Sequence, residues 1–255
     1  MKAVWIIAKK ELRAYFTSPI AYVVMTVFLV LTGFFFYSLV WWFNAQSMQA
    51  AQNPYYAQQM NINLMVFGPL FNNMSIILLL VLPLLTMRLL AEEKKAGTEE
   101  LLMTSPISVW RIIMGKYLAS LLVVAAMLAL TALPAVFTFL YGNPELAPIL
   151  NGYLGLFLMA AAFLAVGLFF SSLTENQIVA AVLTFGALLL FWVLNWASGS
   201  ASGFWSAVLN YVSFFPHFGN STQGILDTTD LVYYASFAFF GLFLTHAVIQ
   251  SRRWR

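Results

Sequence analysis

Residues 64–106 read LMVFGPLFNNMSIILLLVLPLLTMR (64–88) and then LLAEEKKAGTEELLMTSP (89–106). The first part carries one charge, that of Arg88 at its end, and has the ~20 mostly apolar residues that a membrane-crossing helix needs. The stretch 92–106 then gathers six of the chain's 21 Lys, Arg, Asp and Glu residues. The sequence therefore predicts a membrane-spanning helix that leads into a short charged connector.

The composition of the whole chain agrees with a lipid environment. Its 255 residues are 62% hydrophobic, 17% aromatic and only 8% charged, whereas a soluble domain carries about 25% charged residues. We expect one membrane domain over residues 1–255, with no room for a soluble one. The net charge of +3 is too small to indicate a nucleic-acid partner, and the absence of cysteine excludes disulfides, cysteine metal sites and a cysteine nucleophile.

Six stretches are long and apolar enough to cross a bilayer: 20–43, 64–88, 109–141, 149–171, 177–196 and 231–250. They are too long and too uniformly apolar for barrel strands, which alternate. The predicted fold class is therefore all-α, a polytopic membrane protein with six transmembrane helices. The first run is too long for a signal-peptide core and is expected to be retained.

The basic residues predict the orientation of these spans, because Lys and Arg concentrate on the cytoplasmic side. The three connections near 44–63, 142–148 and 197–230 contain none of the twelve Lys and Arg residues. A cytoplasmic N-terminus places all twelve inside, so both termini are expected in the cytoplasm. Tryptophans at span ends, such as Trp41, Trp42 and Trp196, fit anchoring at headgroup depth.

An amphipathic helix is predicted within residues 1–18, ahead of the first span. Lys9, Lys10 and Arg13 fall on one side of it and apolar residues on the other, although Glu11 breaks the pattern. Such a helix lies in the inner interface with its cations toward lipid headgroups. Whether this cationic side only anchors the helix or also contacts a cytoplasmic partner stays open. The pair Ser18-Pro19 should end the helix.

The outer region 197–230 holds a second non-spanning element. The run FWSAVLNYVSFF (204–215) is too short to cross and is predicted to be a re-entrant or outer-interface helix. His217, Asp227 and Asp230 follow it; we interpret them as a polar cap rather than a metal or acid–base site, because one imidazole and two carboxylates are a thin set. No metal site is expected.

A few polar residues and prolines lie inside the spans. Asn72, Asn73 and Asn195 are candidates for hydrogen bonds between helices or for lining a substrate pathway, and we favour helix packing. Pro83 and Pro134 are expected to kink the second and third spans.

The connector 92–106 has its own local signals. Glu92 and Glu93 continue past the second span, and Gly97 permits a sharp change of direction. Thr98 can cap a short new helix whose first turn holds Glu99 and Glu100, where negative charge is favoured. The apolar residues Leu101, Leu102 and Met103 follow, and Pro106 ends the helix. Exposed leucines on a short loop either dip into the lipid surface or fit a groove on a partner protein, and the acidic residues beside them favour the groove.

The pattern formed by Glu92-Glu93, Gly97-Thr98, Glu100, Leu102 and Pro106 resembles the coupling segment of ABC-2 type transporter permeases. The stretches 9–24 and 216–234 resemble a narrower branch, the gliding-motility-associated and copper-enzyme-maturation permeases. The resemblance implies that segment 92–106 docks on a cytoplasmic ATPase, which binds ATP and Mg²⁺, and that a second copy or a homologous permease completes the assembly. It also implies the bacterial inner membrane, export or extraction of a substrate, and an auxiliary membrane-anchored protein on the outer side.

The sequence contains no G-x-x-x-x-G-K-[ST] phosphate loop, so the chain is expected to be non-catalytic and to bind no cofactor itself. A secondary transporter is disfavoured because no ionisable residue lies near the middle of a span. A membrane enzyme is disfavoured because His217 and His246 fall on opposite sides. A scaffold that recruits an ATPase to act on an outer-side partner remains an alternative.

Overall fold

The computed structural model of the chain describes residues 2–51, 60–98, 107–200, 202–225 and 227–252, and within these ranges it contains helices and turns but no strand. In chain order its elements are α1 (Lys2–Thr17), α2 (Pro19–Ala50), the π-helix η1 (Asn63–Phe67), α4 (Gly68–Thr86), α5 (Ala91–Lys95), α7 (Val109–Tyr141), α8 (Leu146–Leu173), α9 (Gln177–Ser200), α10 (Phe204–Val212), α11 (Phe214–Thr222) and α12 (Thr228–Arg252).

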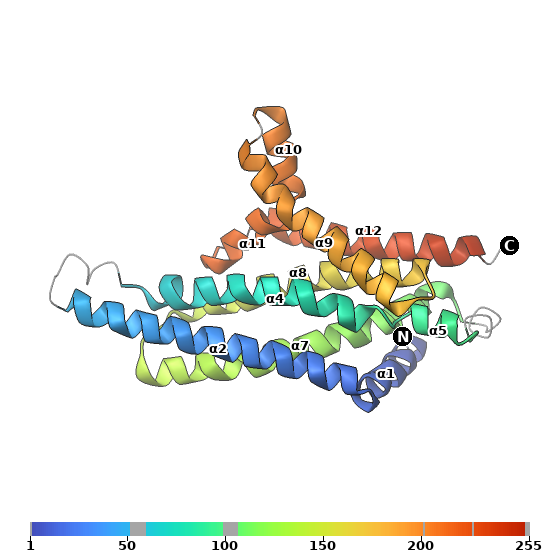
Figure 1. Ribbon diagram of the computed structural model, residues 1–255, viewed down its shortest axis with the longest axis horizontal. Coiled ribbons are helices and arrows are strands. Elements are labelled where there is room, and N and C mark those ends of the chain that lie inside the picture. The colour runs from blue at the N-terminus through green and yellow to red at the C-terminus, as the bar shows by residue number, and fades with distance from the viewer. Residues whose placement is uncertain (1, 52–59, 99–106, 201, 226, 253–255) are drawn as a thin grey trace.

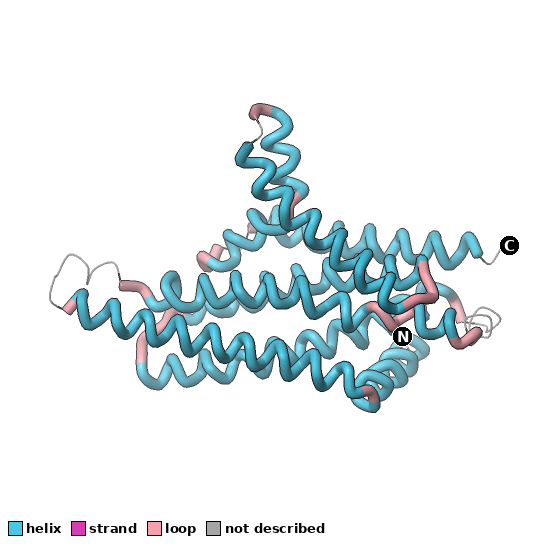
Figure 2. The backbone as a smooth tube through the Cα atoms, in the orientation of Figure 1, coloured by secondary structure: helices cyan, strands magenta, loops and turns pink. Residues whose placement is uncertain are grey.

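The long helices α2, α4, α7, α8 and α12 run along the long axis of the molecule (Figure 1). Figure 2 shows that α9 and α10 form a helical hairpin that projects away from these helices. Helix α1, helix α5, the start of α7 and the end of α12 lie at the same end of the bundle, here called the basic end. All lysines and arginines within the described ranges belong to these four places or to the turn that precedes α5.

Six segments of the described chain are long and apolar enough to cross a membrane: Pro19–Ala50, Asn63–Lys95, Val109–Leu140, Leu146–Leu173, Gln177–Ser200 and Thr228–Ser251. The prediction of an all-α polytopic membrane protein is confirmed. The second and fourth segments are the most enclosed, with 72% and 67% of their most apolar windows buried, against 17–33% in the other four. The core therefore forms around α4 and α8, and the other spans present apolar side chains outward, as lipid contact requires.

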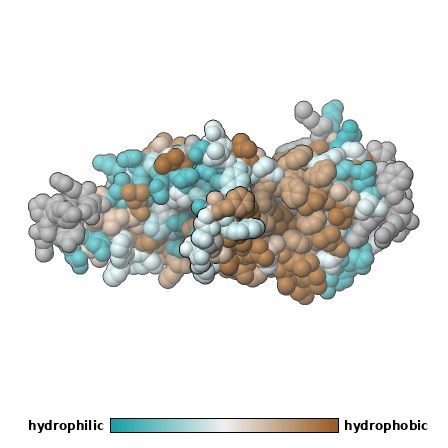
Figure 3. Space-filling view, turned by 90° about the horizontal axis from the view of Figure 1, so that it is seen from above, coloured by the Kyte–Doolittle hydropathy of each residue, from teal (hydrophilic) through white to brown (hydrophobic). Residues whose placement is uncertain are grey.

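The hydropathy of the surface agrees with this placement. On the face seen in Figure 3, the largest group of apolar residues lies right of the middle, and hydrophilic residues gather over the left part of the molecule and again toward its right end. An apolar zone between two hydrophilic ones is the distribution expected when that zone faces hydrocarbon and the two ends face water.

Helix α8 packs closely because it has glycines where its neighbours approach. A Cβ on Gly152 would lie 2.1 Å from the Phe71 ring, one on Gly155 2.6 Å from Ser221, and one on Gly167 2.1 Å from the Thr86 hydroxyl oxygen. Small residues allow helices in a membrane to approach until van der Waals contacts hold them. Helix α8 is thus the centre against which α4 and α11 pack.

We expect Gly167→Ala to lower the free energy of unfolding by about 1–3 kcal/mol, the usual effect of overpacking. The new methyl group would also lie 2.6 Å from the Cβ of Thr86, which is fixed to its backbone and cannot rotate away. Thermal unfolding of the protein in lipid nanodiscs measures this. Gly186→Ala on α9 is the control, since nothing lies within 4 Å of its Cβ. Equal melting temperatures for the two variants would contradict the packing argument.

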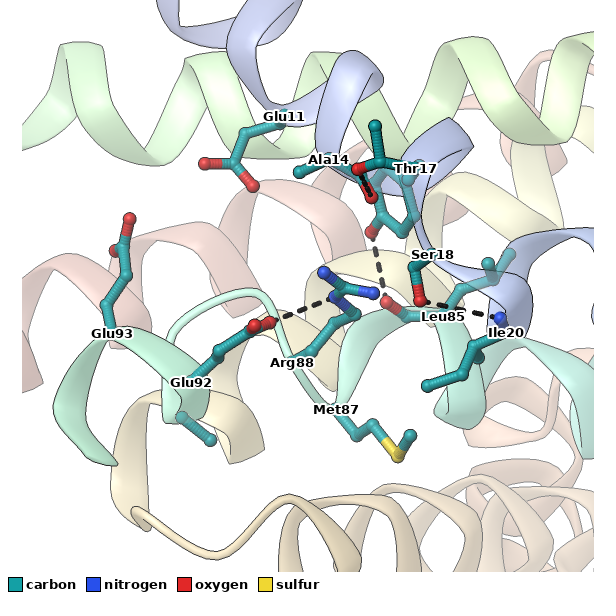
Figure 4. Close-up of polar contacts among 12 residues, drawn as sticks. Glu11, Ala14, Thr17, Ser18, Ile20, Leu85, Met87, Arg88, Glu92 and Glu93 are labelled. Atoms are coloured by element: carbon teal, nitrogen blue, oxygen red, sulfur yellow. Dashed lines mark hydrogen bonds and ion pairs between the residues drawn. The ribbon is translucent and has the colours of Figure 1, made fainter. Parts of the chain in front are cut away.

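The N-terminal helix is observed as expected from the sequence. Helix α1 ends at Thr17, and Ser18 takes an extended conformation with φ −91° and ψ 136°. The Ser18 hydroxyl oxygen accepts a hydrogen bond from the backbone N–H of Ile20, which caps the start of α2 (Figure 4). Pro83 and Pro134 both lie inside continuous helices, and the kinks expected at these residues stay a prediction.

The outer region differs from its prediction. A single helix was expected over 204–215 with a polar cap after it, but two nine-residue helices, α10 and α11, meet at Ser213. Pro216 explains the break, because a proline inside one long helix would clash with the carbonyl four residues earlier. As the third residue of α11 it is tolerated, and the Ser213 hydroxyl donates to the Phe191 carbonyl of α9 at 3.2 Å.

His217 and Asp230 join α11 to α12. The Nδ1 atom of His217 lies 2.7 Å from an Asp230 carboxylate oxygen, and its Nε2 lies 2.9 Å from the Tyr211 carbonyl, which can only accept a hydrogen bond. Asn220 donates to the second carboxylate oxygen, and the Tyr233 ring stacks on the imidazole at 4.0 Å. Asp227 points elsewhere and accepts from the Thr229 backbone N–H. Within the described ranges, no three His, Cys, Asp or Glu side chains converge as metal ligands would.

His217→Phe should keep the stacking on Tyr233 but remove both hydrogen bonds of the imidazole. We expect a loss of about 1–3 kcal/mol of unfolding free energy, because the buried carboxylate of Asp230 and the Tyr211 carbonyl each lose a partner. Asp227→Asn is the control; this exposed residue keeps its acceptor oxygen, and the variant should unfold like the parent protein. Chemical or thermal unfolding in nanodiscs tests the pair, and an unaffected His217→Phe variant would refute the structural role of this contact.

Candidate functional site at the basic end

The second span is interrupted where it reaches the basic end. Helix α4 ends at Thr86, residues 87–90 form turns, and α5 begins at Ala91. A break in a helix frees backbone carbonyls that need new partners. The Tyr15 hydroxyl of α1 donates to the Leu85 carbonyl at 3.0 Å, and burial raises the pKa of Tyr15, which keeps its hydroxyl protonated. The Ser171 hydroxyl of α8 donates to the Met87 carbonyl, also at 3.0 Å.

Ser171 also caps the start of α5. Its hydroxyl oxygen accepts hydrogen bonds from the backbone N–H groups of Leu90 and Ala91, at 3.0 and 3.1 Å. A hydroxyl has one proton to donate and two lone pairs, and here all three are used. An N-cap normally comes from the residue that precedes the helix. In this case it comes from another span, which fixes the position of α5 on α8.

The end of α5 is closed by a glycine turn. Gly97 has φ +67°, its N–H bonds to the Lys94 carbonyl, and the N–H of Thr98 bonds to the Glu93 carbonyl. These two bonds form a Schellman motif, in which a residue with positive φ ends a helix. The Thr98 hydroxyl donates to the same Glu93 carbonyl at 3.2 Å. The chain therefore leaves α5 through a defined turn within the connector.

Four charged residues from three elements meet beside α5. Lys116 of α7 is 2% exposed, and its ammonium nitrogen lies 3.0 Å from a Glu11 carboxylate oxygen and 2.9 Å from one of Glu93. Lys10, 67% exposed, lies 3.5 Å from Glu93 and 3.8 Å from Glu11. In Figure 4, Glu11 and Glu93 approach the same gap from α1 and from α5. We call Lys10, Glu11, Glu93 and Lys116 the inner charge cluster.

Further contacts flank the inner charge cluster. Arg88 pairs with Glu92 one turn later at 3.0 Å (Figure 4), and its guanidinium carbon lies 6.0 Å from the centre of the Tyr15 ring. Lys94 is buried and donates to the Ser172 carbonyl of α8. A cavity of about 240 Å³ opens between α1 and α5 and is lined by Lys10, Glu11, Arg88, Glu92, Glu93, Thr98 and Lys116, among others. The basic end thus presents one polar surface built from α1, α5 and α7.

Some of the predicted site residues belong to this surface. Glu92, Glu93, Gly97 and Thr98 form the start of the connector, and Lys10 joins Glu93, while Lys9 and Arg13 are exposed on α1. Glu99, Glu100, Leu101, Leu102 and Pro106, with the short helix expected there, lie outside the described residues. Asn72, Asn73 and Asn195 are half-buried. Asn72 and Asn73 lie near the start of α4, and Asn195 lies near the end of α9.

Sequence reasoning missed the residues that hold α5 in place. Lys116 was counted only for the orientation of the spans, Glu11 only as a break in an amphipathic pattern, and Tyr15 and Ser171 had no assigned role. A signal existed for the first two: a lysine two turns inside an apolar helix needs a carboxylate partner, and Glu11 was a carboxylate on an otherwise basic helix. Ser171 gave no such signal, because its partners are backbone groups.

These features define a multi-pass membrane protein with six spans. Its charged connector lies between the second and third spans, and its polar surface lies at one end of the bundle. The family comparison makes the class specific: the model of the ABC-2 family transporter proteins matches residues 5–249, and the chain belongs to this family. It is therefore a membrane permease subunit of an ABC transporter, and such permeases generally act as dimers with an ATPase partner. A comparison with curated proteins gave no match. The narrower branch suggested by the sequence stays a prediction.

Ser171→Ala should loosen α5 without removing any charge. It leaves two backbone N–H groups and one carbonyl without their partner, and we expect a loss of about 1–3 kcal/mol locally. Hydrogen exchange of peptides that cover residues 87–98 should become faster. Ser172→Ala is the matched control, since that hydroxyl bonds only within its own helix, to the Phe169 carbonyl. Equal exchange in the two variants would refute the capping role.

Proposed function

We propose that this permease subunit couples ATP hydrolysis by a separate ATPase subunit to export or extraction of a substrate across the bacterial inner membrane. The observation that carries the proposal is that the start of the connector is attached to three other helices. Helix α5 is capped by α8, paired to α1 and α7, and closed by a glycine turn immediately before residue 99. A segment that receives mechanical work needs such a rigid attachment.

The basic end is then the cytoplasmic end. The distribution of lysine and arginine supports this orientation, because these residues concentrate on the cytoplasmic side of membrane proteins. The start of α1 and the end of α12 lie at this end together with α5 (Figure 1). An ATPase in the cytoplasm would meet α1, α5 and the connector from one direction.

The ATPase chemistry belongs to a partner chain in this proposal. No phosphate loop occurs in the sequence, so ATP and Mg²⁺ would be bound by the ATPase subunit. Two permease subunits, identical or related, would each offer one connector to one ATPase. Leu101 and Leu102 would enter an apolar groove on it, with Glu99 and Glu100 at the polar rim. Lys9, Lys10 and Arg13 of α1 would extend this contact, because the polar cavity beside α5 is lined by both helices.

Replacing Leu101 and Leu102 together by Asp should release the ATPase, because the apolar groove cannot accept two charges. The measurement is the amount of ATPase that copurifies with the tagged permease, together with the ATP turnover of the complex. We expect each to fall by at least about tenfold, as removal of anchor residues worth ~2 kcal/mol or more implies.

The control for this variant is Thr104→Asp with Ser105→Asp, which adds the same charge to the same connector without removing the leucines. Undiminished binding and stimulated ATP turnover in the leucine variant would overturn the proposed docking. ATP-dependent flux or extraction in reconstituted vesicles separates transport from a scaffold that recruits the ATPase to an outer-side partner.

A further inference from the structure

Helix α5 is poorly placed to transmit movement into α4. Helix α4 ends at Thr86, with the Met87 N–H still bonded to the Pro83 carbonyl, and residues 87–90 form turns before α5 begins at Ala91. Helix α5 is therefore not an uninterrupted helical continuation of α4. Some other contact must carry movement of the connector into the bundle.

We propose that Lys116 is that contact: a positioning residue that fastens α5 and α1 to α7, so that a displaced connector moves α7 and α1 together. The inference rests on the proposed function, since it needs an ATPase at the connector. Glu93 lies near the start of the connector, five residues before Thr98, and α7 begins at Val109 just beyond the connector's end. Both ends of the connector therefore lead to α7, one through the chain and one through Lys116.

The burial of Lys116 makes this contact hard to replace. An ammonium that is 2% exposed is stable only with close anionic partners, and both of its carboxylates lie within 3.0 Å. Lys10 is 67% exposed and more distant, so water screens its attraction to the same carboxylates. Without Lys116, Glu11 and Glu93 would repel each other, and α1 and α5 would lose their shared attachment.

Packing adds to the attachment of α1. A Cβ on Gly115, the residue before Lys116, would lie 2.7 Å from the Cβ of Ile7 and 3.0 Å from the Val4 carbonyl. Helix α1 therefore lies directly on α7 beside the ion pairs. On its other side α5 contacts α8 through its first residues and Lys94. A tilt of α5 about those contacts would pull on the Glu93–Lys116 ion pair.

Spin-label distances test the transmission directly, because the chain has no cysteine and every introduced one is unique. Labels at Leu133→Cys on α7 and Phe239→Cys on α12 would face lipid, with 58% and 63% of these residues exposed. The full permease with its copurifying ATPase is compared in nanodiscs with ADP and with ATP plus vanadate. We expect the distance to shift in the parent protein and to stay fixed in Lys116→Met, although the ATPase stays bound.

Permease-stimulated ATP turnover gives a second readout. Lys116→Met should lower it by at least about fivefold, the lower range of a coupling between sites. Lys116→Arg should restore both turnover and shift, since a guanidinium can also hold two carboxylates. Glu93→Gln leaves Lys116 paired with Glu11 and should lose part of the spin-label distance shift. If Lys116→Met does not fold, Glu93→Gln tests the role of the ion pairs in its place. Glu175→Gln, an exposed carboxylate at the same end, should behave as the parent protein.

The outcomes separate this inference from the proposed function. A full distance shift in Lys116→Met, or in Glu93→Gln if only that variant folds, would overturn the role of the ion pairs. A bound, active ATPase with no shift in the parent protein would overturn movement of α7. Absence of any ATPase from the parent complex would instead overturn the proposed function, and the inference with it.

Discussion

The interruption of the second span at the basic end is the constraint from which the rest of this structure follows. Backbone groups near a bilayer must be hydrogen-bonded by the protein itself, so a helix can break there only where other elements supply donors and acceptors. Tyr15 supplies a donor from α1, and Ser171 supplies one donor and a double acceptor from α8. Because the break needs both, the interfacial helix and the fourth span are fixed relative to the second span, and α5 emerges in a defined direction.

Helix α5 is held by different kinds of contact on its two sides. Toward α8 the contacts are hydrogen bonds between Ser171 and backbone groups, about 0.5–1.5 kcal/mol each, and the bond from the buried Lys94 ammonium to the Ser172 carbonyl, about 1.5–3 kcal/mol because its donor is charged. Toward α7 the contact is a buried ammonium between two carboxylates, and breaking such a pair on one side costs about 3–5 kcal/mol. Helix α5 is therefore attached on both sides, by hydrogen bonds to α8 and by ion pairs to α7 and α1.

Local signals in the sequence were sufficient for much of this architecture. The spans followed from runs of about 20 apolar residues, and Ser18-Pro19 marked the boundary between α1 and α2 because a serine cap and a proline act within two residues. The break at Ser213 was also readable, since Pro216 disfavours a helical hydrogen bond to the carbonyl of Val212, but the prediction ended the helix at Phe215 instead. What could not be read was the pairing of distant positions: Glu11 meets Lys116 across 105 residues, and Ser171 meets Leu90 across 81. Periodicity orders residues around one helix and contains no information on which helix lies opposite.

Lys116 also shows why a charge deep in an apolar span need not belong to a transport pathway. An ionisable residue in a span is first suspected of contacting a substrate or an ion. Here one partner of the ammonium belongs to α1, which precedes the first span, and the other to α5, at the basic end of the second span, and the pairs lie two turns from the start of α7. The charge thus binds α1 and the end of the second span to the third span. The same two carboxylates that make the burial of Lys116 tolerable link the connector to the membrane helices, so folding of the basic end and its mechanical attachment depend on one set of contacts.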